Sequence, residues 1–140
     1  MHMLRPLFLA SILAAAISTS PAEDEDKSSP VDLLMESISR DMKKLSRQFD
    51  NAASKASSLE LVDAMIKANT EAKSLDPESV GDRAGAERDA YLARYREGMD
   101  ELGQCLSSLK AALETDNTGD AEALIDKAYA LRKKYHDELL

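Results

Sequence analysis

Apolar residues recur with a seven-residue repeat between positions 91 and 113, and this repeat limits the folds that are open to the chain. Its members are Tyr91 or Leu92, followed by Tyr95, Met99, Leu102, Leu106, Leu109 and Leu113. Steps of three and four residues place these side chains on one face of an α-helix. Such a face has to be buried, so the segment predicts packing of helix on helix. Gly98 and Gly103 each cost roughly 1 kcal/mol of helix propensity. They indicate close approach of a neighbouring helix, with clearance for a flat ligand as the weaker alternative.

Three further segments carry the same periodicity, and no segment alternates for long enough to be a strand. Their predicted inner faces are Met35, Ile38, Met42, Leu45, Phe49 and Ala52; then Leu61, Val62, Met65, Ala68, Ala72 and Leu75; and last Leu124, Ile125, Ala128, Leu131, Arg132, Tyr135 and His136. Connections of about eight residues or fewer make consecutive helices antiparallel neighbours. We therefore expect an all-α fold, an antiparallel up-down-up-down four-helix bundle.

Capping and stop signals predict where these helices begin and end. Ser29 suits the cap of the first helix, and Pro30 suits its first position. Ser57 and Glu60 have the spacing of a capping box for the second helix, which Pro77 ends. The loops are expected at residues 51–58, 78–85 and 115–120.

The first 22 residues predict an export signal and not a part of the bundle. Arg5 precedes an apolar run at residues 7–17, and Ser20 and Ala22 are small residues suited to a cleavage site after Ala22. The run is shorter than the ~20 apolar residues that span a bilayer. We expect a signal peptide at 1–22, a disordered acidic tether at 23–29 and the bundle domain at 30–140. The mature chain is then soluble and periplasmic, without membrane insertion.

An excess of acidic residues restricts the expected partners. The chain has 26 Asp and Glu against 18 Lys and Arg, a net charge of −8 that cleavage after Ala22 would change to −9. Nucleic acids and anionic lipids are bound by patches of Lys and Arg, so neither is an expected partner. The excess favours solubility, with docking to a basic redox partner as the functional alternative.

The predicted topology brings the start of the first helix and the end of the last helix to one pole of the bundle. Met35 lies about six residues into the first helix and His136 about four residues before the end of the last, so their depths agree within a turn. A thioether and an imidazole across a bundle core suit the two axial positions of a haem iron. Periodicity alone leaves the other interpretation open, because Met often fills gaps in a core and a single His is often an ordinary surface or core residue.

The same pole collects a mainly apolar lining around these two residues. Its expected members are Ile38, Met42, Leu75, Pro77, Tyr91, Leu92, Tyr95, Met99 and Arg132. Arg132 lies one turn from His136, where a cation can pair with a haem propionate or raise the potential of the iron, so we expect it to tune the group. Cys105 is the single cysteine, so no internal disulfide and no Cys-x-x-Cys-His attachment is possible. Any haem here would be held non-covalently.

Three stretches carry a family resemblance: residues 31–38 (VDLLMESI), 95–100 (YREGMD) and 132–136 (RKKYH). In these stretches the chain resembles the cytochrome b562 family of periplasmic haem proteins, and the diffuse similarity extends over residues 30–140. The first stretch resembles the family's start, where an early Met is one axial ligand. The last resembles its closing Arg-x-x-Tyr-His, where the His is the other ligand. The resemblance implies haem b ligated by Met35 and His136 and lined by Arg132, Tyr95 and Met99, the last two at positions where the family often has Phe.

The chain departs from the family pattern in a longer first loop and in a last helix that reaches its His sooner after the turn. Met42 is a second candidate ligand, although it lies ~10 Å deeper than Met35. We expect a one-electron carrier and not an enzyme, because Met/His-ligated iron has no open position for a substrate. Its partners would be haem and an unidentified redox protein. The alternative is a haem-free periplasmic helix bundle that acts as a binding or stress-response module.

Overall fold

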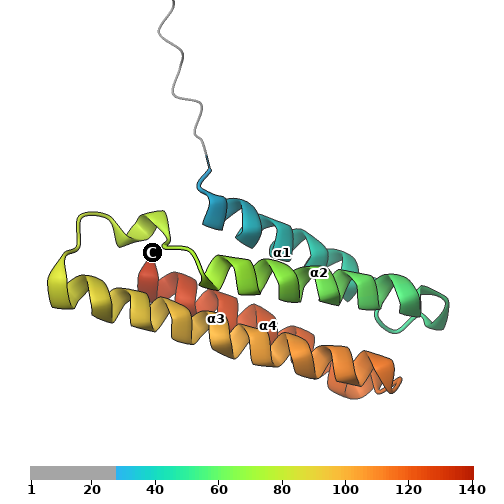
Figure 1. Cartoon of the computed structure of the whole chain (residues 1–140). Helices are drawn as coiled ribbons and strands as arrows, with labels where there is room; N and C mark the ends of the chain where they lie inside the picture. Colours follow the sequence, from blue (N-terminus) through green and yellow to red (C-terminus); the bar gives the residue numbers. More distant parts are fainter. Residues whose placement is uncertain (1–27) are drawn as a thin grey trace, which may run out of the picture.

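The computed structural model describes residues 28–140, and in it four long helices run antiparallel in chain order (Figure 1). They are α1 (Pro30–Ser46), α2 (Lys55–Lys73), α3 (Gly85–Glu114) and α4 (Thr118–Leu139), with two 3-10 helices, η1 (Ala52–Ser54) and η2 (Glu78–Val80), in the first two connections. The predicted all-α up-down-up-down bundle is confirmed. The predicted signal peptide, residues 1–22, and positions 23–27 of the predicted tether lie outside the described residues.

The beginnings of α1 and α4 are fixed by side chains that satisfy free backbone groups. The Ser29 hydroxyl accepts a hydrogen bond from the Asp32 N–H at 3.2 Å, and the Asp32 carboxylate accepts one from the Ser29 N–H at 3.2 Å. Pro30 follows the cap, as its fixed φ favours. At α4 the Asn117 side chain accepts from the Asp120 N–H at 3.1 Å, so α4 begins inside the stretch that was predicted as a turn.

The start of α2 differs from the prediction. The capping box of Ser57 and Glu60 does not form, because α2 already begins at Lys55. Instead, the Gln48 amide donates hydrogen bonds to the hydroxyls of Ser57 at 2.8 Å and Ser58 at 3.2 Å. The two serines therefore tie the second helix to the end of the first helix and do not cap it.

One large apolar cluster fills most of the bundle, and smaller ones lie at a single pole. Fully buried side chains of the large cluster include Ile38, Met42, Leu45, Val62, Met65, Leu106 and Leu109, all on the predicted inner faces. Two smaller clusters contain Tyr95 with Met99, and Tyr91 with Leu92. The apolar packing is thus interrupted near one end of the molecule.

The contact between the first and last helices is the weakest of the four helix seams. Each helix packs extensively against its neighbour in the chain, whereas α1 and α4 touch at only a few places. The N-terminal end of α1, the C-terminal end of α4 and the connection between α2 and α3 all lie at the same end of the bundle (Figure 1). This is the pole at which the sequence predicted a ligand site.

Candidate functional site

A cavity of about 460 Å³ opens at this pole and is lined by α1, the η2 segment, α3 and α4. The five residues that were singled out from the sequence all contribute to its wall: Met35, Tyr95, Met99, Arg132 and His136. Its volume falls within the usual range of small-molecule sites, about 300–1,000 Å³. Residues that are far apart in the chain therefore meet around one space.

Met35 reaches the cavity because it lies shortly after the capped start of α1. Its side chain is partly buried and packs against the small cluster that contains Tyr95 and Met99. Met42, the alternative candidate, does not contribute to the cavity wall. Its side chain is 2 % exposed and belongs to the large cluster, so its thioether is enclosed by core residues.

His136 lies at the rim of the cavity, and its side chain is 69 % exposed. The sequence predicted both Tyr135 and His136 on the inner face of the last helix, but only Tyr135 is buried, at 6 %. The nearest carboxylate to the imidazole is that of Asp137, with Nδ1 and Oδ1 3.8 Å apart, which is beyond hydrogen-bond distance. The imidazole is thus accessible to a ligand.

Arg132 places a partly buried positive charge in the wall of the cavity. Its Nη2 donates a hydrogen bond to the Ser39 hydroxyl of α1, while its buried Nε has no hydrogen-bond partner among the described residues. Within residues 28–140 no carboxylate lies within ion-pair distance of it. Burial lowers the pKa of Arg132, because desolvation disfavours the charged form. A partly buried cation without a counter-charge favours a ligand that carries an anionic group.

Two tyrosines form walls of the cavity, and their hydroxyls are already satisfied by the protein. Tyr95 donates to the carbonyl oxygen of Ala72 on α2 at 2.6 Å. The Tyr91 hydroxyl lies 2.9 Å from the carbonyl oxygen of Leu139 and 2.5 Å from the Ser79 hydroxyl. Both rings therefore offer a ligand mainly apolar surface, and Tyr91 also holds the last turn of α4 against α3.

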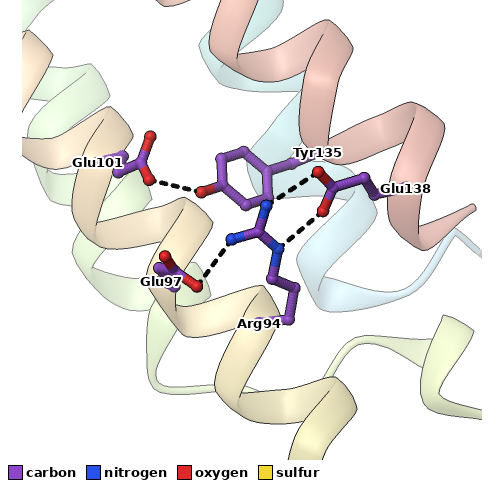
Figure 2. Close-up of polar contacts among 5 residues, drawn as sticks. All are labelled: Arg94, Glu97, Glu101, Tyr135 and Glu138. Carbon is purple, nitrogen blue, oxygen red and sulfur yellow. Dashed lines mark hydrogen bonds and ion pairs between the residues drawn. The ribbon is translucent and has the colours of Figure 1, made fainter.

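Several residues in the cavity wall or next to it, among them Gly98 and Tyr135 in the wall itself, were not identified as functional from the sequence. Figure 2 shows the Tyr135 hydroxyl donating to Glu101, and Arg94 lying between Glu97 and Glu138. The one sequence signal was Gly98, which indicated close helix approach. A Cβ atom at this position would lie 2.6 Å from Cδ1 of Tyr135, so that prediction is confirmed.

The fold and the site together define an antiparallel helix bundle with a ligand cavity at one end, walled by thioether, imidazole, phenol and guanidinium groups. The model of the cytochrome b562 family matches residues 31–139, and the chain belongs to this family. Members of the family are b-type haem electron carriers and are not enzymes. Searches of the curated proteins and of the solved structures gave no match. Within residues 28–140, none of the helices has the length and apolar character needed to cross a bilayer.

Proposed function

We propose that the protein holds one haem b in the cavity between α1 and α4, with Met35 and His136 as axial ligands, and carries single electrons. The observation that supports this most directly is that both residues line one cavity, in a chain of the cytochrome b562 family. They come from opposite ends of the sequence and from the two helices that touch least.

The chemistry of the cavity wall fits this group. Met99, Leu102 and Leu131 supply apolar surface, as do the rings of Tyr91 and Tyr95. The unpaired Nε of Arg132 suits a propionate, because a carboxylate would supply the hydrogen bond and the counter-charge that the guanidinium lacks. With Cys105 as the single cysteine, attachment through two thioether bonds is excluded, and the haem would be non-covalent.

The residues of the chain would serve electron transfer by occupying both axial positions. The haem iron supplies the one-electron chemistry when bound, and its potential depends on the axial ligands and on their surroundings. A thioether from Met35 favours the reduced iron, and the Arg132 charge acts in the same direction. With both positions taken by residues of α1 and α4, the iron would have no open position for a substrate.

We propose further that the protein works after export to the periplasm, where a redox protein is its partner. The arrangement of residues 1–22 supports cleavage after Ala22, and the acidic balance of the remaining chain supports a basic docking surface on the partner. The intact mass of the secreted protein tests the export step. A mature product that retains residues 7–17 would contradict it.

Titration of the purified apoprotein with haemin tests the proposal as a whole. We expect saturation at one haem per chain, a low-spin Soret band and sharp bands after reduction. Protein purified from the periplasm should already be red. A colourless protein that also fails to bind added haemin would favour the alternative, a haem-free helix bundle that acts as a binding or stress-response module.

A further inference from the structure

The residue before the proposed ligand is held far more firmly than the ligand itself. Tyr135 is 6 % exposed and its hydroxyl donates to Oε1 of Glu101 on α3 at 2.7 Å. The guanidinium carbon of Arg94 lies 4.7 Å from the centre of its ring, a cation–π contact. His136 is mostly exposed, and no hydrogen bond orients its imidazole within residues 28–140.

Arg94 reaches α4 on both sides of His136. Besides the Tyr135 ring, it contacts the Glu138 carboxylate, with Nε 2.7 Å from Oε2 and Nη2 2.8 Å from Oε1 (Figure 2). A third bond, from Nη1 to Glu97 at 2.8 Å, anchors the guanidinium to its own helix. This paired geometry fixes direction as well as distance. Positions 135 and 138 are therefore tied to a single side chain of α3.

The Tyr135 ring packs directly on Gly98, in the space that a side chain at position 98 would occupy. A Cβ atom at position 98 would lie 2.6–2.9 Å from three ring atoms, closer than real Cβ contacts occur. Arg94 also contacts this ring, so the ring cannot move away from position 98 without disturbing that contact. Any side chain at position 98 would push this part of α4 away from α3.

Metal-binding histidines are usually oriented by a hydrogen bond to the second ring nitrogen. In this protein the described residues supply no such bond to His136, so the direction of its imidazole depends on how α4 is rotated about its axis. That rotation is set by the neighbouring Tyr135, because successive residues of a helix differ by ~100°.

We propose that Gly98, Arg94 and Glu101 are positioning residues for the haem ligand: they clamp Tyr135 and thereby turn His136 toward the cavity. This inference rests on the proposed function, because it assigns these residues a role in haem ligation. None of the three contributes to ligation itself. They act through α4.

Gly98→Ala tests the packing of the Tyr135 ring on Gly98, and Gly103→Ala is the matched control on the same helix. At position 103 a Cβ atom would meet only the Asn69 side-chain amide, at 3.0 Å, on the side of α2. We expect Gly98→Ala to lower the haem affinity about 10-fold or more, the range found for residues that support metal ligands. Its low-spin EPR g-values should also shift, or high-spin iron should develop. Gly103→Ala should match the wild type in both.

Arg94→Gln removes the contacts of Arg94 with Tyr135 and Glu138 without adding volume, and Arg88→Gln is its control. Arg88 lies on α3 near the same pole and pairs with Asp76, at 2.5 Å, without contacting α4. We expect Arg94→Gln to shift the g-values and the reduction potential, whereas Arg88→Gln leaves both unchanged. In the apoprotein, the NMR signals of the His136 imidazole should move in Arg94→Gln and Gly98→Ala and stay in place in the controls.

Urea unfolding of the four apoproteins separates positioning from a general loss of stability. Altered g-values and imidazole signals in variants that remain folded would support the proposal. If Gly98→Ala does not fold, the outcome with Arg94→Gln decides. Wild-type protein that binds haemin, with variants that match their controls in every spectrum, would overturn the positioning role alone. Wild-type protein that binds no haemin would overturn the proposed function and this role together.

Discussion

Arg132 carries a positive charge that no carboxylate balances within residues 28–140. Single side chains such as this one determine which ligands the cavity can bind. Its guanidinium is partly buried and donates a hydrogen bond to the Ser39 hydroxyl, while its Nε has no hydrogen-bond partner among the described residues. Met35 and His136 add a thioether and an imidazole to the same wall. A ligand of this cavity would therefore need an anionic group for Arg132 and a metal ion that accepts a thioether and an imidazole.

The axial pair is the sharpest prediction at this scale. His136→Ala should abolish tight haem binding or leave a weakly held high-spin species, because imidazole is the stronger ligand. Met35→Ala should retain haem but convert low-spin iron at least partly to high-spin iron and lower the potential. Optical and EPR spectra of the loaded variants measure both effects.

Met42→Ala is the control for this pair. It should leave the low-spin spectrum intact and cost about 2–5 kcal/mol of unfolding free energy, because it empties a core position. If Met42→Ala opened the coordination site and Met35→Ala did not, the register of α1 against α4 would differ from the one described here.

Arg132→Leu should keep the haem while changing its properties. Loss of the charge removes the proposed partner of a propionate, so we expect a modestly weaker affinity and a lower reduction potential. The apoprotein should become no less stable, because the substitution also removes a desolvated cation. Potentiometry and haemin titration are the measurements. Complete loss of haem would assign Arg132 a holding role.

Cys105 should be unreactive in the folded protein. Its thiol is buried, lies 3.3 Å from the carbonyl oxygen of Leu124, and has a pKa that burial raises above its ordinary value of 9.0. The Cys105 thiol therefore stays protonated to a higher pH in the folded protein than in the unfolded chain. The protonated thiol contributes to the free energy of unfolding below pH 9.0, and this contribution is lost as the pH rises through the folded-state pKa.

Two measurements check this behaviour of Cys105. At pH 8, alkylation should be slow in the native protein and fast in urea. Above pH 9.0, the unfolding free energy should fall less steeply for Cys105→Ala than for the wild type. A disulfide-linked dimer on a non-reducing gel would show that the thiol is accessible after all.

At the scale of the helices, the open seam between α1 and α4 is the most consequential feature. Helix α1 is supported mainly by α2, because the cavity replaces part of the surface that α4 would otherwise cover. The longest helix, α3, is packed on both sides along its length by α2 and α4. Local stability should therefore be lowest in the N-terminal half of α1.

Hydrogen exchange can test this difference between helices. In the apoprotein, amides 34–38 of α1 should exchange faster than amides 102–113 of α3. Addition of haemin should slow the α1 amides strongly, since Met35 would then be ligated, and should change the α3 amides much less. Uniform exchange across the bundle in the apoprotein would contradict the idea that α1 is the loosely held element.

For the whole molecule, haem and fold should be thermodynamically linked. A ligand that binds only the folded state at 1,000 times its Kd adds about 4 kcal/mol to the unfolding free energy. For a domain of this size, that corresponds to a rise in Tm of roughly 15 °C or more.

Thermal unfolding of loaded and extracted protein measures this linkage. Removal of haem should lower the Tm, and re-addition should restore it. His136→Ala provides the control, because its apoprotein should melt close to the wild-type apoprotein and gain little from haemin. An equal rise in Tm in both proteins on addition of haemin would show that the haem is not bound through His136.

The local features of this protein were determined by its sequence. Periodicity predicted four helices and most of their inner faces, although α1 ends at Ser46, before Phe49 and Ala52 of the predicted face. The cap at Ser29 fixed how far Met35 lies from the start of α1. These features depend on neighbours within a few residues, so they are readable without the fold. Helix lengths and short connections also require little tertiary information. They were enough to predict that one cavity would be lined by Met35, Tyr95, Met99, Arg132 and His136.

Only the tertiary structure decided the rotation of α4 and the charges around the site. Tyr135 and His136 are adjacent on the border of an apolar face, and periodicity assigned both to the inside. The space above Gly98 accepts just one of them, and the hydrogen bond that Tyr135 donates to Glu101, with the cation–π contact from Arg94, makes that residue Tyr135. Likewise, the isolation of Arg132 depends on which side chains other helices bring near it. Contacts between distant segments have no local pattern, so these features could be read only from the folded chain.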